Sequence, residues 1–183
     1  MKLHIKFIII ILGCLMATGG YAQKVIVEGN KVIIDASALR NSTTVKKATG
    51  TDATATTMGT NDASNIASKF SNETVYHRFE ISPYDNMYAA PWLRMVNQCK
   101  EVNLNGTGWR LPTIRELMLI YLLLDELRLV ILPGFQSLTE GQRYWSATEE
   151  SADRAATVFL RDHKVVALQK SGGEGNSRCI RDL

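Results

Sequence analysis

The chain has 183 residues, of which 45% are hydrophobic and 21% are charged, as is usual for a globular protein. This length is enough for one domain with a real core and some additional chain. The formal net charge is +3, and two lysines lie in the first 22 residues. Without them, 19 basic residues stand against 18 acidic ones, so the charge gives no reason to expect a nucleic-acid partner.

Residues 1–22 are typical of a secretory signal peptide. Lys2 and Lys6 make a basic start, an apolar run follows over residues 7–16, and small residues lead to a cleavage site after Ala22. The apolar run is too short for a comfortable membrane span. The alternative is a lipoprotein signal that would anchor the protein through Cys14. We therefore expect an exported protein, in the periplasm, at the cell surface or secreted, with no membrane span after cleavage.

Residues 23–38 contain two runs of β-branched residues around Glu28-Gly29-Asn30, which predicts a hairpin or part of a larger sheet. A hairpin alone is marginal in water. We expect it either to dock on the main domain or to pair with another subunit through residues 24–36. Residues 39–73 are rich in Thr, Ala and Ser with little periodicity, which predicts a linker or an irregular loop.

Residues 74–183 have the pattern of one folded domain. Alternating apolar and polar side chains predict a strand over residues 74–82. A helix from about residue 86 would place Trp92, Val96 and Cys99 on one inward face.

A second helix is expected over residues 114–132, where Pro133 and Gly134 end it. Short strands are expected over residues 155–161 and 164–170 and around Cys179. Helices followed by several short strands indicate an α+β fold with an antiparallel sheet.

The segment GTGWRLPTIREL, residues 106–117, resembles an active-site motif but has a structural explanation throughout. Thr113 is placed to cap a helix, and Glu116 lies at the spacing of a capping box. Trp109 has a large apolar body to bury. Arg110 and Arg115 are interpreted as partners in structural salt bridges, with ligand contacts as the alternative.

Two cysteines, Cys99 and Cys179, remain after removal of the signal peptide. An even number in an exported chain predicts one disulfide. The bridge would close a loop of about 80 residues and contribute roughly 4 kcal/mol of stability. The alternative is two buried free thiols.

Three motifs in this order, GWRLPTIREL, YWSATE and the terminal RCIRDL, resemble the Lcl C-terminal domain family. These are exported bacterial domains, some of them paralogous families in Bacteroidota, whose fold is similar to that of C-type lectins. The resemblance covers about residues 76–183. It implies a lectin-like domain after an N-terminal hairpin and linker, and a disulfide from the first helix to the last strand, where Cys99 and Cys179 fall. It also implies a core position for Trp145.

The calcium and sugar triplets of true C-type lectins, EPN-like or QPD-like and WND-like, are absent from the sequence. A long loop is expected between Pro133 and Ala155, and loops carry recognition residues. A cluster of three carboxylates in it offers oxygen ligands for calcium, but we favour a solvated loop. The candidate ligand-binding residues are Arg143, Glu149, Glu150, Asp153 and Arg154.

The function expected from these observations is a non-catalytic adhesion module that recognises a glycan or an envelope protein, with no cofactor. The alternative is a structural or tip subunit of a surface appendage. A remote alternative is an oxidoreductase similar to formylglycine-generating enzymes, which share an RLPT-like turn and hold copper on two nearby cysteines. His77 and His163 lie beside no recognisable nucleophile, so no catalytic residue is proposed.

Overall fold

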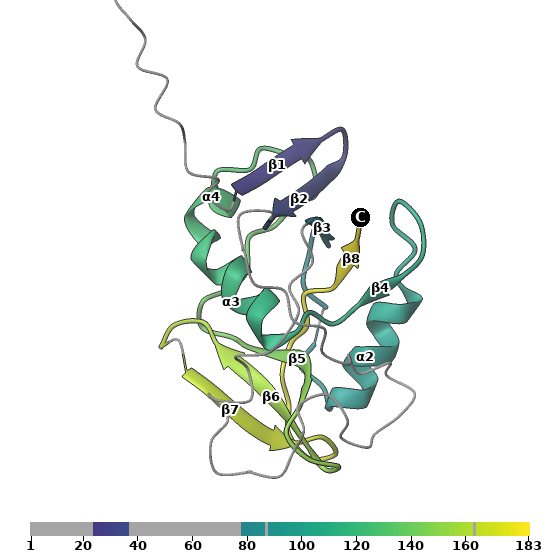
Figure 1. Ribbon diagram of the computed structural model, residues 1–183, viewed down its shortest axis with the longest axis vertical. Helices are drawn as coiled ribbons and strands as arrows, with labels where there is room; N and C mark the ends of the chain where they lie inside the picture. The colour runs from purple at the N-terminus through teal and green to yellow at the C-terminus, as the bar shows by residue number, and fades with distance from the viewer. Residues whose placement is uncertain (1–23, 37–77, 87, 163) are drawn as a thin grey trace, which may run out of the picture.

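The computed structural model describes residues 24–36, 78–86, 88–162 and 164–183 (Figure 1). The expected signal peptide with Cys14, the linker over residues 39–73 and both mature histidines lie outside the described residues. The described part has an α+β architecture with three helices and two antiparallel sheets. Figure 1 shows the two sheets toward opposite ends of the molecule, with α3 and α4 on one side and α2 on the other.

The larger sheet has five strands in the order β1-β2-β3-β8-β4. Its strands are β1 (Lys24–Glu28), β2 (Lys31–Asp35), β3 (Arg78–Ile81), β4 (Trp109–Arg110) and β8 (Ile180–Asp182). The hairpin of β1 and β2 turns at Gly29, whose φ of +62° suits glycine. Since β2 pairs with β3, the N-terminal hairpin docks on the domain of its own chain.

The smaller sheet has three strands, β5 (Arg143–Glu149), β6 (Arg154–Phe159) and β7 (Lys164–Gln169), in sequence order. The expected loop between Pro133 and Ala155 is therefore partly wrong, because β5 lies within it. Its side chains are buried from Tyr144 to Glu149, so the alternating pattern that identifies a half-exposed strand is missing. The register shifts between Trp145 and Glu149, which also obscures the period.

The first helix, α2 (Trp92–Glu101), buries Trp92, Met95, Val96 and Cys99 on the inward face that the spacing predicts. It begins at residue 92 instead of 86, because Pro91 has extended backbone at φ −58° and ψ 152°. Val102, also extended, ends it. The helix therefore holds Cys99 in its last turn, facing the core.

The helix expected over residues 114–132 is two helices, α3 (Ile114–Leu122) and α4 (Leu124–Arg128). Leu123 leaves helical geometry at φ −103° and ψ 17°. A straight helix presents only one stripe of side chains to a core. The break lets the apolar residues on both sides of it reach one cluster, including Leu119, Leu123 and Leu127.

The core has two clusters. An aliphatic cluster is formed mainly by α3, α4, β2, β3 and β6. The second, named here the tryptophan cluster, contains Trp92, Trp109, Trp145, Cys99 and Cys179. All three indole N–H groups donate to backbone carbonyl oxygens, at 2.8–2.9 Å. A buried indole needs such a partner, so the cluster is both apolar and fully hydrogen-bonded at its tryptophans.

Candidate functional site

The segment from Trp109 to Glu116 is a structural corner, as predicted. Thr113 Oγ1 accepts the Glu116 N–H at 3.3 Å, and Glu116 Oε2 accepts the Thr113 N–H at 2.8 Å, which completes the capping box. Arg110 donates to both Glu116 oxygens at 2.8 Å and to Asp182 at 2.5 Å. Burial lowers the Arg110 pKa, but the two carboxylates outweigh burial and raise it above its ordinary value. This arginine therefore ties α3 to β8.

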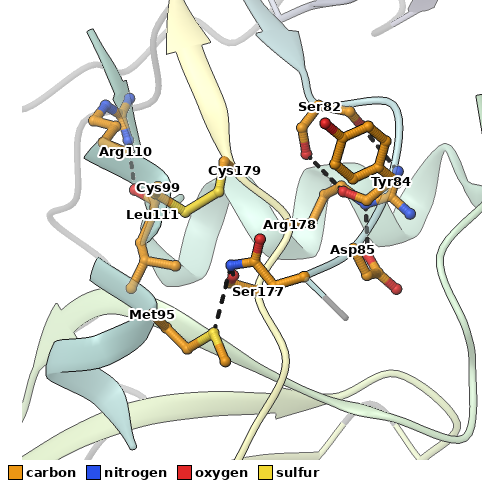
Figure 2. The surroundings of a disulfide bond; sticks show 11 residues. Ser82, Tyr84, Asp85, Met95, Cys99, Arg110, Leu111, Ser177, Arg178 and Cys179 are labelled. Carbon is orange, nitrogen blue, oxygen red and sulfur yellow. Dashed lines mark hydrogen bonds and ion pairs between the residues drawn. A yellow bond between two sulfur atoms is a disulfide. The ribbon is translucent and has the colours of Figure 1, made fainter. Parts of the chain in front are cut away.

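Cys99 and Cys179 form a disulfide, with Cα atoms 5.4 Å apart and a sequence separation of 80. Figure 2 shows that the bridge joins α2 to the chain leading into β8. Both cysteines are buried, and Cys179 immediately precedes β8 instead of lying within it. The bridge is therefore part of the core, and free thiols are excluded for this pair.

Two of the five residues predicted to bind a ligand are buried. Glu149 is only 1% exposed, and it accepts from Lys170 Nζ at 2.5 Å. Glu150 is 8% exposed and accepts from Arg154 Nε at 3.1 Å. The interpretation of these acids as a solvated loop is wrong for Glu149 and Glu150, because each is buried beside a cation.

Of the three other members of that set, Arg143 and Asp153 are exposed and Arg154 is half-buried. Arg143 lies at the start of β5. Asp153 accepts from Ser151 Oγ at 2.7 Å, and this hydrogen bond lowers the pKa of its carboxyl. The carboxylates of Glu149, Glu150 and Asp153 are not arranged as a set of metal ligands. Among the described residues, no set of three or more His, Cys, Asp or Glu side chains is placed to hold a metal ion.

Lys170 explains why this acidic segment is internal. Its ammonium lies 4.8 Å from the centroid of the Trp92 ring and also donates to the Ala152 carbonyl at 2.8 Å. A buried ammonium is tolerated only with a carboxylate and further acceptors around it. Glu149 and Lys170 therefore fasten β5 to the end of β7 beside the tryptophan cluster.

A different part of the surface forms a hollow of about 280 Å³. It lies among the N-terminal hairpin, the end of β3, the loop after α2 and the loop after α4. We call it the hollow; its lining residues are Asn30, Val32, Glu80, Ile81, Pro83, Tyr84, Leu104, Asn105 and residues 132–135. Ligand sites are commonly concave, largely apolar and supplied with a few fixed polar groups. The hollow has this composition.

The polar side of the hollow is a chain of hydrogen bonds. Asn30 Nδ2 donates to Asn105 Oδ1 at 2.9 Å, and Asn105 Nδ2 donates to Glu80 Oε1 at 2.7 Å. Glu80 is 2% exposed and pairs with Arg181 at 2.5 Å. Asn105 has a φ of +55°, a conformation that asparagine tolerates better than most residues. The Asn105 side chain is therefore fixed by its hydrogen bonds to Asn30 and Glu80 and by its backbone conformation.

The apolar side of the hollow is formed by the rings of Tyr84 and Phe135. The remaining apolar lining residues are Pro83, Leu104, Leu132 and Pro133. Tyr84 is 47% exposed, so part of its ring is available to a ligand. Its backbone carbonyl accepts from Ser82 Oγ at 3.0 Å (Figure 2). The aromatic ring thus extends from a fixed backbone.

Arg178 holds the two loops behind this wall. It is fully buried and donates to the carbonyls of Ser82 at 2.9 Å and Gln136 at 2.8 Å, with Asp85 at 2.6 Å as its counter-ion. Its guanidinium carbon lies 5.9 Å from the centroid of the Phe135 ring. One side chain therefore joins the segment after β3 to the loop after α4 and keeps the hollow in shape.

Tyr144 extends this network. Its hydroxyl lies 2.6 Å from Asp85 Oδ2 and accepts from the Thr139 N–H at 2.8 Å. Burial raises the pKa of Tyr144 well above its ordinary value, and the Asp85 carboxylate raises it further. The phenol is thus held in its neutral form beside the aspartate.

The sequence reasoning missed the hollow. Pro83, Asn105 and Pro133-Gly134 mark turns in the sequence. Nothing in the local pattern indicates that these turns meet, because they come from segments of the chain far apart. The sequence therefore predicts that these loops exist but not that they form a hollow together.

No protein-family model matches the chain, and a search of curated proteins finds no match. In the described part of the chain, no helix has the length and apolar character needed to cross a membrane. The interpretation of function therefore depends on the geometry of the site.

Proposed function

We propose that the protein is an exported, non-catalytic recognition module whose ligand is a sugar unit of a glycan, bound in the hollow. The observation that carries the proposal is the pairing of an exposed aromatic ring, Tyr84, with the exposed amides of Asn30 and Asn105 across one concave space, where the buried Glu80 holds Asn105 in place. Amide groups hydrogen-bond hydroxyls, and an aromatic face covers the apolar side of a ring.

The size of the hollow supports a small ligand. A volume of about 280 Å³ is just below the usual range for ligand pockets, so it suits one ring-sized group. Its rigidity supports binding as well, because a site ordered in advance loses less entropy when the ligand arrives. The buried Arg178 network provides that order.

The resemblance to the Lcl C-terminal domain family and to C-type lectin-like folds remains part of the proposal. The α+β architecture and the bridge between α2 and the segment before β8 agree with what the resemblance implies. The disulfide also supports export, because such bonds persist in oxidising compartments.

The oxidoreductase alternative is weakened by the same bond. Copper held by two cysteines requires thiolates. The sulfur atoms of Cys99 and Cys179 are bonded to each other and buried, so this pair is not available as ligands.

A glycan array with the exported protein tests the proposal, followed by titration of any bound glycan against two matched variants. We expect Tyr84→Ala to weaken binding at least tenfold. Tyr88→Ala is the control, because Tyr88 is also exposed, at 73%, but does not line the hollow. Equal binding by both variants would mean that the glycan does not bind in the hollow.

A third variant separates the hollow from the loop that the sequence predicted. Arg143→Ala removes an exposed member of that predicted set. Loss of binding in Arg143→Ala, with Tyr84→Ala unaffected, would restore the sequence-based site. If no glycan on the array binds and the protein captures an envelope protein instead, the proposed ligand is a protein and not a sugar.

A further inference from the structure

The outer edge of β1 is a second surface with recognisable chemistry. β1 is the terminal strand of the five-stranded sheet, and in the described part of the chain no strand pairs with its outer side (Figure 1). β2 is bonded on both sides, by β1 and β3, so it offers no free edge. Within residues 24–36, only β1 can therefore pair with a strand of another subunit. An edge strand presents a row of N–H and C=O groups that another strand can pair with.

The direction of these groups follows from the hairpin. Glu28 pairs with Lys31 across a two-residue turn, so Glu28, Ile26 and Lys24 bond to β2. Val25 and Val27 then direct their N–H and C=O groups to the outer side. The outer edge of β1 therefore presents the N–H and C=O groups of two residues, Val25 and Val27.

The sequence of β1, KVIVE, is complementary to itself in the antiparallel sense. When two copies pair around Ile26, Lys24 of each lies opposite Glu28 of the other, and Val25 lies opposite Val27. Opposite charges also lie across the ladder between β1 and β2, at Lys24 with Asp35 and at Glu28 with Lys31, and Glu28 forms an ion pair with Arg78 at 2.7 Å. Parallel pairing in register would instead place like charges side by side, which destabilises a sheet.

Exposed apolar side chains occur on β1 and in the segment that follows α4. Val27 is 46% exposed, and α4 packs beside β1. Leu129 and Ile131, which follow α4, are 78% and 97% exposed. Exposed apolar side chains of this kind commonly mark a protein interface.

We propose that β1 pairs antiparallel with β1 of a second copy, giving a twofold-symmetric dimer with one continuous ten-stranded sheet. Such an interface is isologous and closes on itself. It also joins two hollows in one particle, which raises the avidity for a repetitive surface such as a glycan coat. The pairing is independent of what the hollow binds.

Charge exchange tests the register. Lys24→Glu and Glu28→Lys are made separately in the exported protein, and dimer formation is measured by sedimentation velocity. We expect the unaltered protein to show a concentration-dependent dimer and each variant to weaken it at least tenfold. A mixture of the two variants restores opposite charges at both positions, so we expect a heterodimer in native mass spectrometry.

Disulfide trapping gives a readout that does not depend on affinity. Ile26 is the residue of β1 that meets its own copy across the axis, so we expect Ile26→Cys to give an oxidised covalent dimer. Lys24→Cys is the control, because residue 24 faces residue 28 of the other copy. Equal trapping at both positions would contradict the register.

Folding and alternative partners are separated by two further measurements. Circular dichroism of each variant reports whether its fold is intact, and a variant that fails this criterion is replaced by Val27→Pro. That substitution removes one outward N–H while leaving the bonds to β2 in place. A protein that stays monomeric at all concentrations overturns the proposal. So does another chain that co-purifies with the protein and is lost in Val27→Pro, which would favour the appendage-subunit alternative.

Discussion

The tryptophan cluster and the hollow use polar groups in opposite ways. Beside the tryptophan cluster, Glu149 and Lys170 are buried against each other, at 1% and 6% exposure. At the hollow, Tyr84 is nearly half exposed and the amides of Asn30 and Asn105 are exposed, while Glu80 is buried behind them. The first region has its charges satisfied internally, and the second presents polar groups around an open space.

This difference shows where sequence alone misleads about which side chains are exposed. The segment RYWSATEESADR combines aromatic and charged residues, which is the composition expected of a recognition loop. Two of its acids, Glu149 and Glu150, instead hold strands together, while the hollow is assembled from residues with little individual signal. We therefore expect substitutions near the tryptophan cluster to lower stability and substitutions in the hollow to lower binding, and the predictions that follow test this separation.

The largest effect is expected from removing the disulfide. Cys99→Ala with Cys179→Ala opens a loop of 80 residues and relaxes the unfolded chain. The free energy of unfolding should fall by about 4 kcal/mol. Urea denaturation measures it, with the oxidised parent protein as the control. A loss below about 1 kcal/mol would mean that the tryptophan cluster does not depend on the bridge.

Breaking the buried ion pair should have the next largest effect. Lys170→Met leaves Glu149 buried without its cation, and we expect a loss of about 3 kcal/mol. The double variant Lys170→Met with Glu149→Gln should recover part of this loss, since the uncompensated charge is gone. A double-mutant cycle from urea denaturation measures the coupling between the two residues. Additive effects would contradict a buried pair.

Tyr144→Phe tests the network behind the hollow. Thr139 loses an acceptor and Asp85 loses its contact with the hydroxyl, so we expect a loss of about 1.5 kcal/mol in urea denaturation. Tyr144→Leu, which also removes the ring, is a matched comparison and should cost more, because the ring itself is fully buried.

The raised pKa of Tyr144 adds a pH dependence. Below about pH 10 the phenol is neutral in both the folded and the unfolded chain, and its contribution to stability is fully present. Above that pH the unfolded chain ionises first, so the free energy of unfolding falls as pH rises. This fall should be smaller in Tyr144→Phe. Identical alkaline profiles would show that this phenol is not held neutral in the folded state.

Local rules predicted part of the fold well. The capping box follows from Thr113 and Glu116 being three residues apart, and the inward face of α2 follows from helical spacing. Cys99 and Cys179 were the only candidates for a disulfide after the signal peptide is removed. Each of these depends on short-range periodicity or on a simple count.

Properties that depend on tertiary structure were not predicted. The helix break at Leu123 serves a cluster built from other strands, and β5 has no alternation because both of its faces are covered. The hollow requires Asn30 and Asn105 to meet across 75 residues of chain. The resemblance to a family implies an architecture and does not indicate which loops of this chain converge.

The smallest stability effect is expected at the hollow itself. Tyr84→Ala removes an exposed ring whose only described hydrogen bond is through its backbone carbonyl, so the free energy of unfolding should change by less than about 0.5 kcal/mol. Phe135→Ala, on the same wall, should cost more because Phe135 packs against the core and Arg178. If Tyr84→Ala destabilises the protein as much as Phe135→Ala does, its ring is part of the packing, and a loss of binding in that variant no longer identifies a contact with the ligand.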